Sequence, residues 1–159
     1  MHCFNDNKGR RWEVTLNVRQ VKRIRAVLGI DIANVIALDK GGAVKVDLID
    51  RIANDPVLLV DVLWVLCEGE AKSAGVTDDD FGSSLAGDSI EHATTAFLDE
   101  LVDFFPGARR LFLKKAVGLA RKYSGELTAV LEKTLDDPEL ERRVRESMNS
   151  SASSPASSE

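Results

Sequence analysis

The strongest constraint on the fold comes from the segment around Pro56. The side chain of Asp55 can cap a helix by accepting hydrogen bonds from the free backbone N–H groups of its first turn. Proline suits that turn, because an N–H at this position would have no partner within the helix. Residues 57–67 are then apolar apart from Asp61. Such a run predicts a helix over residues 57–73 that is buried on nearly all sides. A chain with one such helix must wrap its other elements around it.

The N-terminal segment, residues 2–18, predicts a β-hairpin. Polar and apolar residues alternate along its second arm, so that one face carries Trp12, Val14, Leu16 and Val18. The preceding loop is rich in Asn, Asp and Gly, which tolerate the backbone geometry of hairpin loops. An isolated hairpin is marginally stable in water, and we therefore expect its apolar face to pack on helices.

Helical spacing of apolar residues continues after the hairpin. Residues 18–28 predict a helix that stops at Gly29, because glycine readily adopts the left-handed conformation that follows a helix. Residues 30–37 form a short apolar patch whose structure the pattern does not decide. Residues 39–42 predict a turn, and residues 46–53 a short helix.

Three further helices follow the central one. Thr77 is the expected cap of a short acidic helix. Asp88 and Glu91 have the spacing of a capping box for a helix that runs to Phe105. The last long helix is predicted over residues 109–135, with Leu113, Ala116, Val117, Ala120, Leu127, Val130 and Leu131 available for burial.

These signals together predict a mainly α protein: a compact helical domain of about five to seven helices with a small N-terminal β-hairpin, α+β by strict count. The expected single globular domain covers residues 1–135. Residues 136–148 predict a charged C-terminal helix that starts at Pro138. Residues 149–159 are rich in Ser and Ala, and we expect them to be disordered.

Hydropathy and the N-terminal sequence predict a cytoplasmic protein. No apolar run approaches the roughly 20 residues that span a bilayer, and no apolar signal segment opens the chain. Cys3 and Cys67 lack a CxxC partner and are expected to be reduced thiols, Cys67 as a small core residue.

Charge is strongly segregated along the chain. The net charge is +5 over residues 1–25, −12 over 26–103, +5 over 104–135 and −3 over 136–159. One interpretation is self-association or docking on a partner of mixed charge. The simpler interpretation, which we favour at this point, is that folding intermixes these charges on one solvated surface.

A search for catalytic and metal-binding motifs predicts no enzyme, no cofactor and no metal. His92 and Asp88 lie one helical turn apart, but one histidine and one carboxylate make a weak site, and a structural histidine is the better interpretation. Asp78, Asp79 and Asp80 lack the spacing of an EF-hand loop. No nucleophile elbow, P-loop or dinucleotide-binding motif is present in the sequence.

Basic residues near the N-terminus raise the question of nucleic-acid binding. A basic patch interleaved with an aromatic ring can bind phosphates and stack a base. Against this, the pI is about 5.1, and the acidic block at 26–103 would repel a polyanion. We therefore disfavour a nucleic-acid partner and keep it as an alternative. The basic residues of this patch are Lys8, Arg10, Arg11, Arg19, Lys22, Arg23 and Arg25.

Several segments together resemble the small tail assembly chaperones of long-tailed bacteriophages and prophages. The resemblance spans residues 4–135 and is carried by residues 9–12, 21–24, 57–67, 75–82, 87–88 and 96–106. It implies a non-catalytic protein of the host cytoplasm that coats the long, helical, aggregation-prone tape measure protein and gives way to tail tube subunits. Many members also have a longer form made by ribosomal frameshifting.

The candidate partner-binding residues are aromatic. A chaperone for a helix needs exposed apolar surface, and Trp12, Phe104, Phe105 and Phe112 are the rings we nominate for it. The alternative for Phe104 and Phe105 is that both sit in the core at a helix–helix corner. The partner is expected to be the tape measure protein or another helical polypeptide, and a homo-oligomer is possible. Two other functions are open: a structural virion or adaptor protein, and a small DNA-binding regulator that uses the N-terminal basic patch.

Overall fold

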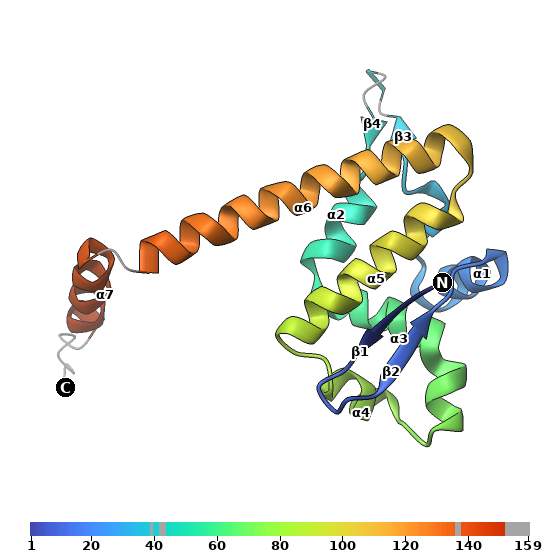
Figure 1. Cartoon of the computed structure of the whole chain (residues 1–159), viewed down its shortest axis with the longest axis horizontal. Helices are drawn as coiled ribbons and strands as arrows, with labels where there is room; N and C mark the ends of the chain where they lie inside the picture. The colour runs from blue at the N-terminus through green and yellow to red at the C-terminus, as the bar shows by residue number, and fades with distance from the viewer. Residues whose placement is uncertain (39, 42–43, 136–137, 152–159) are drawn as a thin grey trace, which may run out of the picture. The chain divides into compact units, whose positions relative to one another are not determined.

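The computed structural model of the chain describes residues 1–38, 40–41, 44–135 and 138–151. These residues form seven α-helices, one short 3-10 helix and two small antiparallel sheets (Figure 1). The predicted mainly α fold with an N-terminal hairpin is confirmed. The chain divides into two compact units, Met1–Lys114 and Lys115–Glu159, and the division falls inside a long helix.

The N-terminal hairpin consists of β1 (His2–Asn5) and β2 (Arg11–Val14). The strands are antiparallel, with Phe4 opposite Trp12. Phe4, Trp12 and Val14 are buried, which confirms the predicted apolar face. The prediction is wrong for Val18, which is 62% exposed, because the strand has already given way to a helix at this residue.

Helix α1 (Val18–Leu28) begins and ends where local signals are strong. The Asn17 side chain accepts a hydrogen bond from the backbone N–H of Gln20. Gly29 follows the helix with a φ of +69°, so the predicted stop is confirmed. Between these ends, Val21 and Ile24 are buried, and α1 packs on the central helix.

Helix α3 (Pro56–Ser73) is the centre of the larger unit. Asp55 accepts hydrogen bonds from the backbone N–H groups of Val57 and Leu58, as predicted. Helices α1, α2 (Asp47–Asn54), α4 (Asp78–Ser83) and α5 (Asp88–Phe104), together with β2, pack on it. The side chains that α3 buries are Leu59, Val62, Leu63, Val65, Leu66, Cys67 and Ala71.

The starts of α4 and α5 differ in how well the sequence predicts them. Thr77 caps α4 by accepting a hydrogen bond from the backbone N–H of Asp80, as expected. The capping box predicted at Asp88 is wrong: Gly87 occupies the cap position with a φ of +58°, and no side chain caps the helix. Asp88 is instead the first helical residue, where its charge still faces the positive end of the helix dipole.

A second hairpin was not predicted. Residues Ile32–Asn34 form the 3-10 helix η1, and β3 (Ala37–Leu38) pairs with β4 (Val44–Lys45). These strands have two residues each, too few for an alternating pattern to identify them. Part of the turn predicted at residues 39–42 lies outside the described residues.

The C-terminal part of the chain is helical. Helix α6 (Gly107–Leu135) covers the predicted long helix, and α7 (Pro138–Ser151) starts at the predicted proline. Residues 149–151 belong to α7, contrary to the expected disorder, and residues 152–159 lie outside the described residues. In the described part of the chain, no helix combines the length and apolar character needed to cross a bilayer.

Candidate polypeptide-binding surface

Trp12 is a core residue in the structure, which corrects its nomination as a surface ring. Its side chain is 2% exposed and meets Phe81 edge-to-face at 5.0 Å between ring centroids. The indole N–H donates a 3.0 Å hydrogen bond to Asp6. The ring is therefore unavailable to a partner unless the hairpin opens.

The three nominated phenylalanines have different environments. Phe104 and Phe105 lie edge-to-face at 5.1 Å, but Phe105 is buried and Phe104 is only partly exposed. Phe105 is thus a core residue at the end of α5, as the alternative interpretation held. Phe112 is 40% exposed, and of the nominated rings it is the one that offers most surface.

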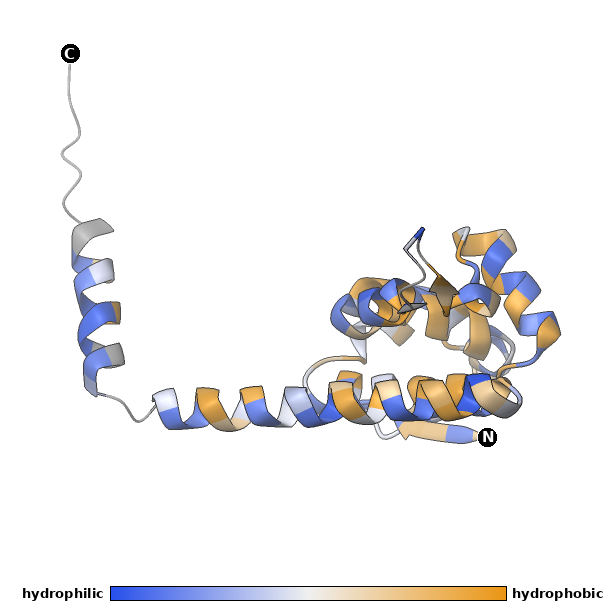
Figure 2. Ribbon diagram, turned by 90° about the horizontal axis from the view of Figure 1, so that it is seen from above, coloured by the Kyte–Doolittle hydropathy of each residue, from blue (hydrophilic) through white to orange (hydrophobic). Residues whose placement is uncertain are grey.

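A larger apolar surface lies further along α6. We define the α6 face as Leu119, Tyr123, Leu127, Val130 and Leu131, which are between 47% and 66% exposed. At about 100° per residue these side chains fall within an arc of roughly 120° on one side of the helix. Figure 2 shows the apolar turns recurring along α6 between charged ones. An apolar arc of this width is typical of a helix that packs against another element.

The polar groups of this helix are largely satisfied without a partner. The hydroxyls of Thr128 and Thr134 donate to the backbone oxygens of Ser124 and Val130, 3.0 Å and 2.8 Å away. Lys122 and Glu126 form an exposed ion pair at 3.9 Å. These polar groups therefore have partners within the helix, whereas the side chains of the α6 face are themselves apolar and can be buried with little desolvation of polar atoms.

The N-terminal loop carries a buried carboxylate. Asp6 accepts hydrogen bonds from the backbone N–H groups of Lys8 and Arg10, and from the side chains of Arg10, Trp12 and Ser84. Burial alone would raise the pKa of Asp6, but these hydrogen bonds outweigh burial and lower it to about 2. This network joins the hairpin to the end of α4, which makes it a structural feature.

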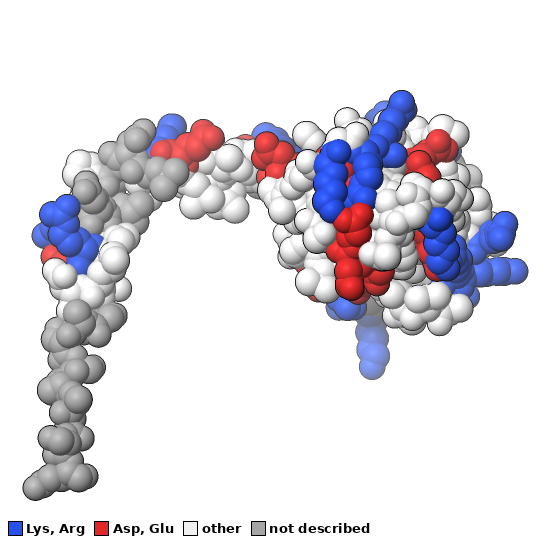
Figure 3. All heavy atoms as spheres, turned by 90° about the horizontal axis from the view of Figure 1, so that it is seen from below, with Lys and Arg blue, Asp and Glu red and all other residues white. Residues whose placement is uncertain are grey.

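The basic patch nominated for nucleic acid is largely paired with carboxylates. Lys8 and Arg10 both bind Asp80, and these contacts lower the pKa of that carboxyl. Arg25 pairs with Asp31, and Arg23 pairs with a carboxylate of α3. On the face that Figure 3 draws, acidic and basic side chains lie next to one another on the larger unit. This pairing weakens the case for binding to a polyanion.

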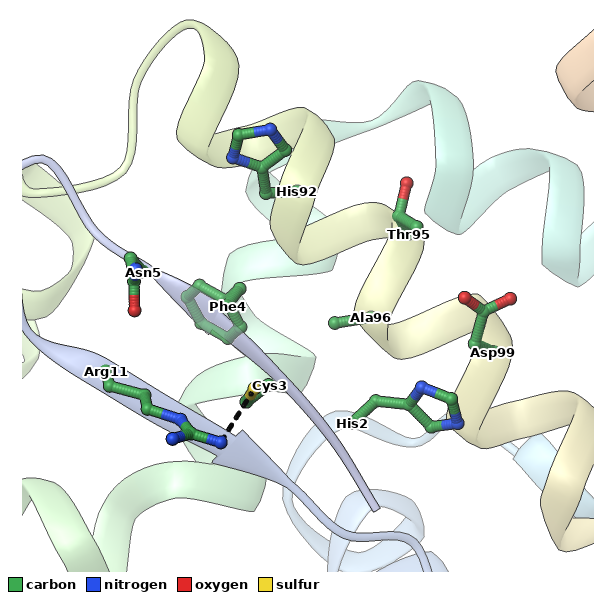
Figure 4. Close-up of a pocket in the computed structure, with 9 residues that line it drawn as sticks. All are labelled: His2, Cys3, Phe4, Asn5, Arg11, His92, Thr95, Ala96 and Asp99. Carbon is green, nitrogen blue, oxygen red and sulfur yellow. Dashed lines mark hydrogen bonds between the residues drawn. The ribbon is translucent and has the colours of Figure 1, made fainter.

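A cavity of about 500 Å³ lies between the hairpin and α5 (Figure 4). His2 borders it and hydrogen-bonds Asp103 at 3.0 Å, which lowers the pKa of that carboxyl. Arg11 donates to Cys3 Sγ at 3.2 Å. His92 is exposed, and within the described residues no three His, Cys, Asp or Glu side chains meet in a way that could hold a metal ion. Of the side chains that line this cavity, Arg11 and Cys3 contact each other, and His2 is paired with Asp103 outside the lining.

The spacing of apolar residues in the sequence predicts an apolar face on α6, but it suggests that this face belongs to the core. The pattern makes Leu127, Val130 and Leu131 available for burial, and in the structure all three are exposed. Spacings of three and four residues mark an apolar face without saying whether the same chain covers it. No family model, curated protein or solved structure matches this chain.

Proposed function

We propose that this protein is a non-catalytic tail assembly chaperone that binds the tape measure protein of a long-tailed phage and keeps it soluble in the host cytoplasm. The observation that carries the proposal is the α6 face, five large apolar side chains of one helix that the chain leaves exposed. Contiguous exposed apolar patches usually mark sites of interaction with another protein.

The shape of the surface suits a helical partner. The part of α6 in the second unit, residues 115–135, is about 30 Å long at the rise of an α-helix. A partner helix that lies along it can bury its own apolar residues at spacings of three, four and seven. The family resemblance supplies such a partner, since tape measure proteins are long, helical and prone to aggregate.

Co-expression tests the proposal. The full chain and a candidate tape measure protein from the same genome are produced together, and the soluble fraction of the partner is measured with and without the chain. We expect a complex and a gain in partner solubility. Leu127→Asp should abolish both, whereas Ala129→Asp, an equal change of charge on the opposite side of α6, should not.

Two outcomes would contradict the proposal. The first is the lack of any complex between the wild-type chain and the tape measure protein. The second is the recovery of stoichiometric copies of the chain from mature particles, because a chaperone leaves during assembly and a structural virion protein stays.

A further inference from the structure

We infer that, before a partner binds, a second copy of this chain covers the α6 face by packing its own α6 face against it in an antiparallel pair. The inference concerns the surface on which the proposed function rests and names what occupies it first. A partner helix would then bind by displacing the second copy, so that the apolar surface is never left open to water.

The spacing of apolar residues fits pairing of two helices. In residues 115–135, Ala116, Tyr123 and Val130 follow one another at intervals of seven, and Ala120 and Leu127 do the same. These two series alternate at spacings of three and four, which is the repeat of a helix–helix seam. The segment has 21 residues, or three such repeats.

The sizes of the seam residues favour the antiparallel arrangement. When two copies pair about a centre near Gly125, Leu127 of one lies opposite Tyr123 of the other, and Val130 lies opposite Ala120. The larger Val130 then meets the small Ala120 on both sides of the centre, which allows close packing there. Leu119 and Leu131 lie at the two edges of this seam, so pairing covers the α6 face of both copies in one step.

Charge along α6 favours the same direction. The helix carries six basic and no acidic residues from Gly107 to Lys122, and its two glutamates, Glu126 and Glu132, come after them. Antiparallel pairing brings Lys122 of each copy to the same edge as Glu126 of the other. Parallel pairing in register would instead align the basic segments with each other, which is unfavourable. Opposed helix dipoles add to the preference.

The oligomeric state of the full chain tests the inference. We expect the mass measured by light scattering after size exclusion to rise from one copy to two over a concentration series. Leu127→Asp should weaken the dimer about a hundredfold, because both copies lose a buried leucine. Ala129→Asp should dimerise like the wild type. A monomeric wild-type chain at every concentration, or equal weakening by both substitutions, would overturn the inference.

Spin-label distances test the direction. Gly125→Cys and Glu132→Cys lie on the back of α6, seven residues apart, and are introduced separately with Cys3→Ser; Cys67 is buried and stays unlabelled. In an antiparallel pair centred near Gly125, the two labels at position 125 lie at almost the same height along the helix axis. The two labels at position 132 are offset along the axis by about 21 Å. The distance between the labels at 132 should therefore be clearly longer than that between the labels at 125. Equal distances would show a parallel pair and overturn the proposed arrangement.

The two proposals fail independently. A monomeric chain that still solubilises the tape measure protein removes the self-pairing and leaves the proposed function in place. A dimeric chain with the predicted distances and no effect on the tape measure protein does the reverse. Competition links the two: adding the tape measure protein to the dimer should give a complex in which each α6 face carries a tape measure helix and no second copy of this chain.

Discussion

The carboxylate of a single residue, Asp6, links the N-terminal hairpin to the end of α4. Its carboxylate receives hydrogen bonds from its own loop and from Ser84, 78 residues away. Asp6→Asn keeps the size of the side chain and removes its charge, so we expect the free energy of unfolding at pH 7 to fall by about 2 kcal/mol. Urea denaturation measures this, and Asp79→Asn on the exposed surface of α4 is the control, with little expected change.

The same group predicts a pH dependence. The pKa of Asp6 is about 2 in the folded chain, below its ordinary value of 3.8. Its stabilising contribution is therefore complete above pH 3.8 and is lost as the pH falls through 2. The difference in stability between wild type and Asp6→Asn should shrink over this interval. A difference that stays constant down to pH 2 would show that the charge of Asp6 is not what stabilises the fold.

The two cysteines should differ sharply in reactivity. Burial raises the pKa of Cys67 to about 12, with a smaller contribution from Glu70, whereas Cys3 is exposed. A thiolate is the reactive form, so a thiol reagent at pH 8 should titrate Cys3 quickly and Cys67 only after denaturation. Cys3→Ser should then show almost no native reactivity. Fast reaction of that variant in the native state would contradict the buried position of Cys67.

Sequence patterns predicted single residues well where the cause is local. Asp55, Thr77 and Asn17 neighbour the backbone groups they cap, and Gly29 ends its helix through its own backbone freedom. The role of Asp6 could not be predicted, because Ser84 reaches it only after the chain has folded. The alternating pattern of the hairpin predicts the burial of Trp12 on its apolar face, and this prediction is in conflict with a role for the ring in binding a partner.

At the scale of elements, the glycines of the helices give a matched pair of tests. Gly29 has a φ of +69°, which other residues adopt at a cost, so Gly29→Ala should lower the free energy of unfolding by about 1 kcal/mol. Gly69 lies inside α3 with open space where a Cβ would be. Gly69→Ala should therefore raise stability by about 1 kcal/mol. Thermal unfolding of both variants measures this, and changes of the same sign would refute the argument.

Helices were easier to predict than strands in this chain. The long apolar run of α3 and the proline before α7 leave few alternatives. The pair β3 and β4 has two residues in each strand, so pairing across the turn and not periodicity defines it. The start of α5 was misplaced by one residue because a glycine with positive φ replaces the side-chain cap that the pattern suggested.

At the scale of the whole molecule, the two units should differ in resistance to opening. Among the described residues, Val117 is the only buried apolar one beyond Lys114. Segments with few buried side chains open at low free-energy cost. Limited trypsin digestion should therefore cut first at Lys and Arg residues beyond Lys114, in α6 and α7, and leave a fragment that contains the larger unit. First cleavage at Arg10 or Arg11 in the hairpin would contradict this ranking.

Self-pairing predicts how that digestion changes in the variants. If the α6 face is covered by a second copy, Leu127→Asp should be cut faster at Lys122 than wild type, and Ala129→Asp should be cut at the wild-type rate. Mass spectrometry of the early fragments measures both rates. Equal rates in all three proteins would mean that the face is not protected.

The contact of β1 with α5 has a consequence for how this protein is made. His2 hydrogen-bonds Asp103, so the first strand finds its place only beside a helix about one hundred residues later in the chain. During translation the hairpin can therefore complete its packing only after α5 has left the ribosome. The α6 face lies further along the chain than α5 and leaves the ribosome after it, so this apolar surface emerges only when the residues of the larger unit are already available to fold.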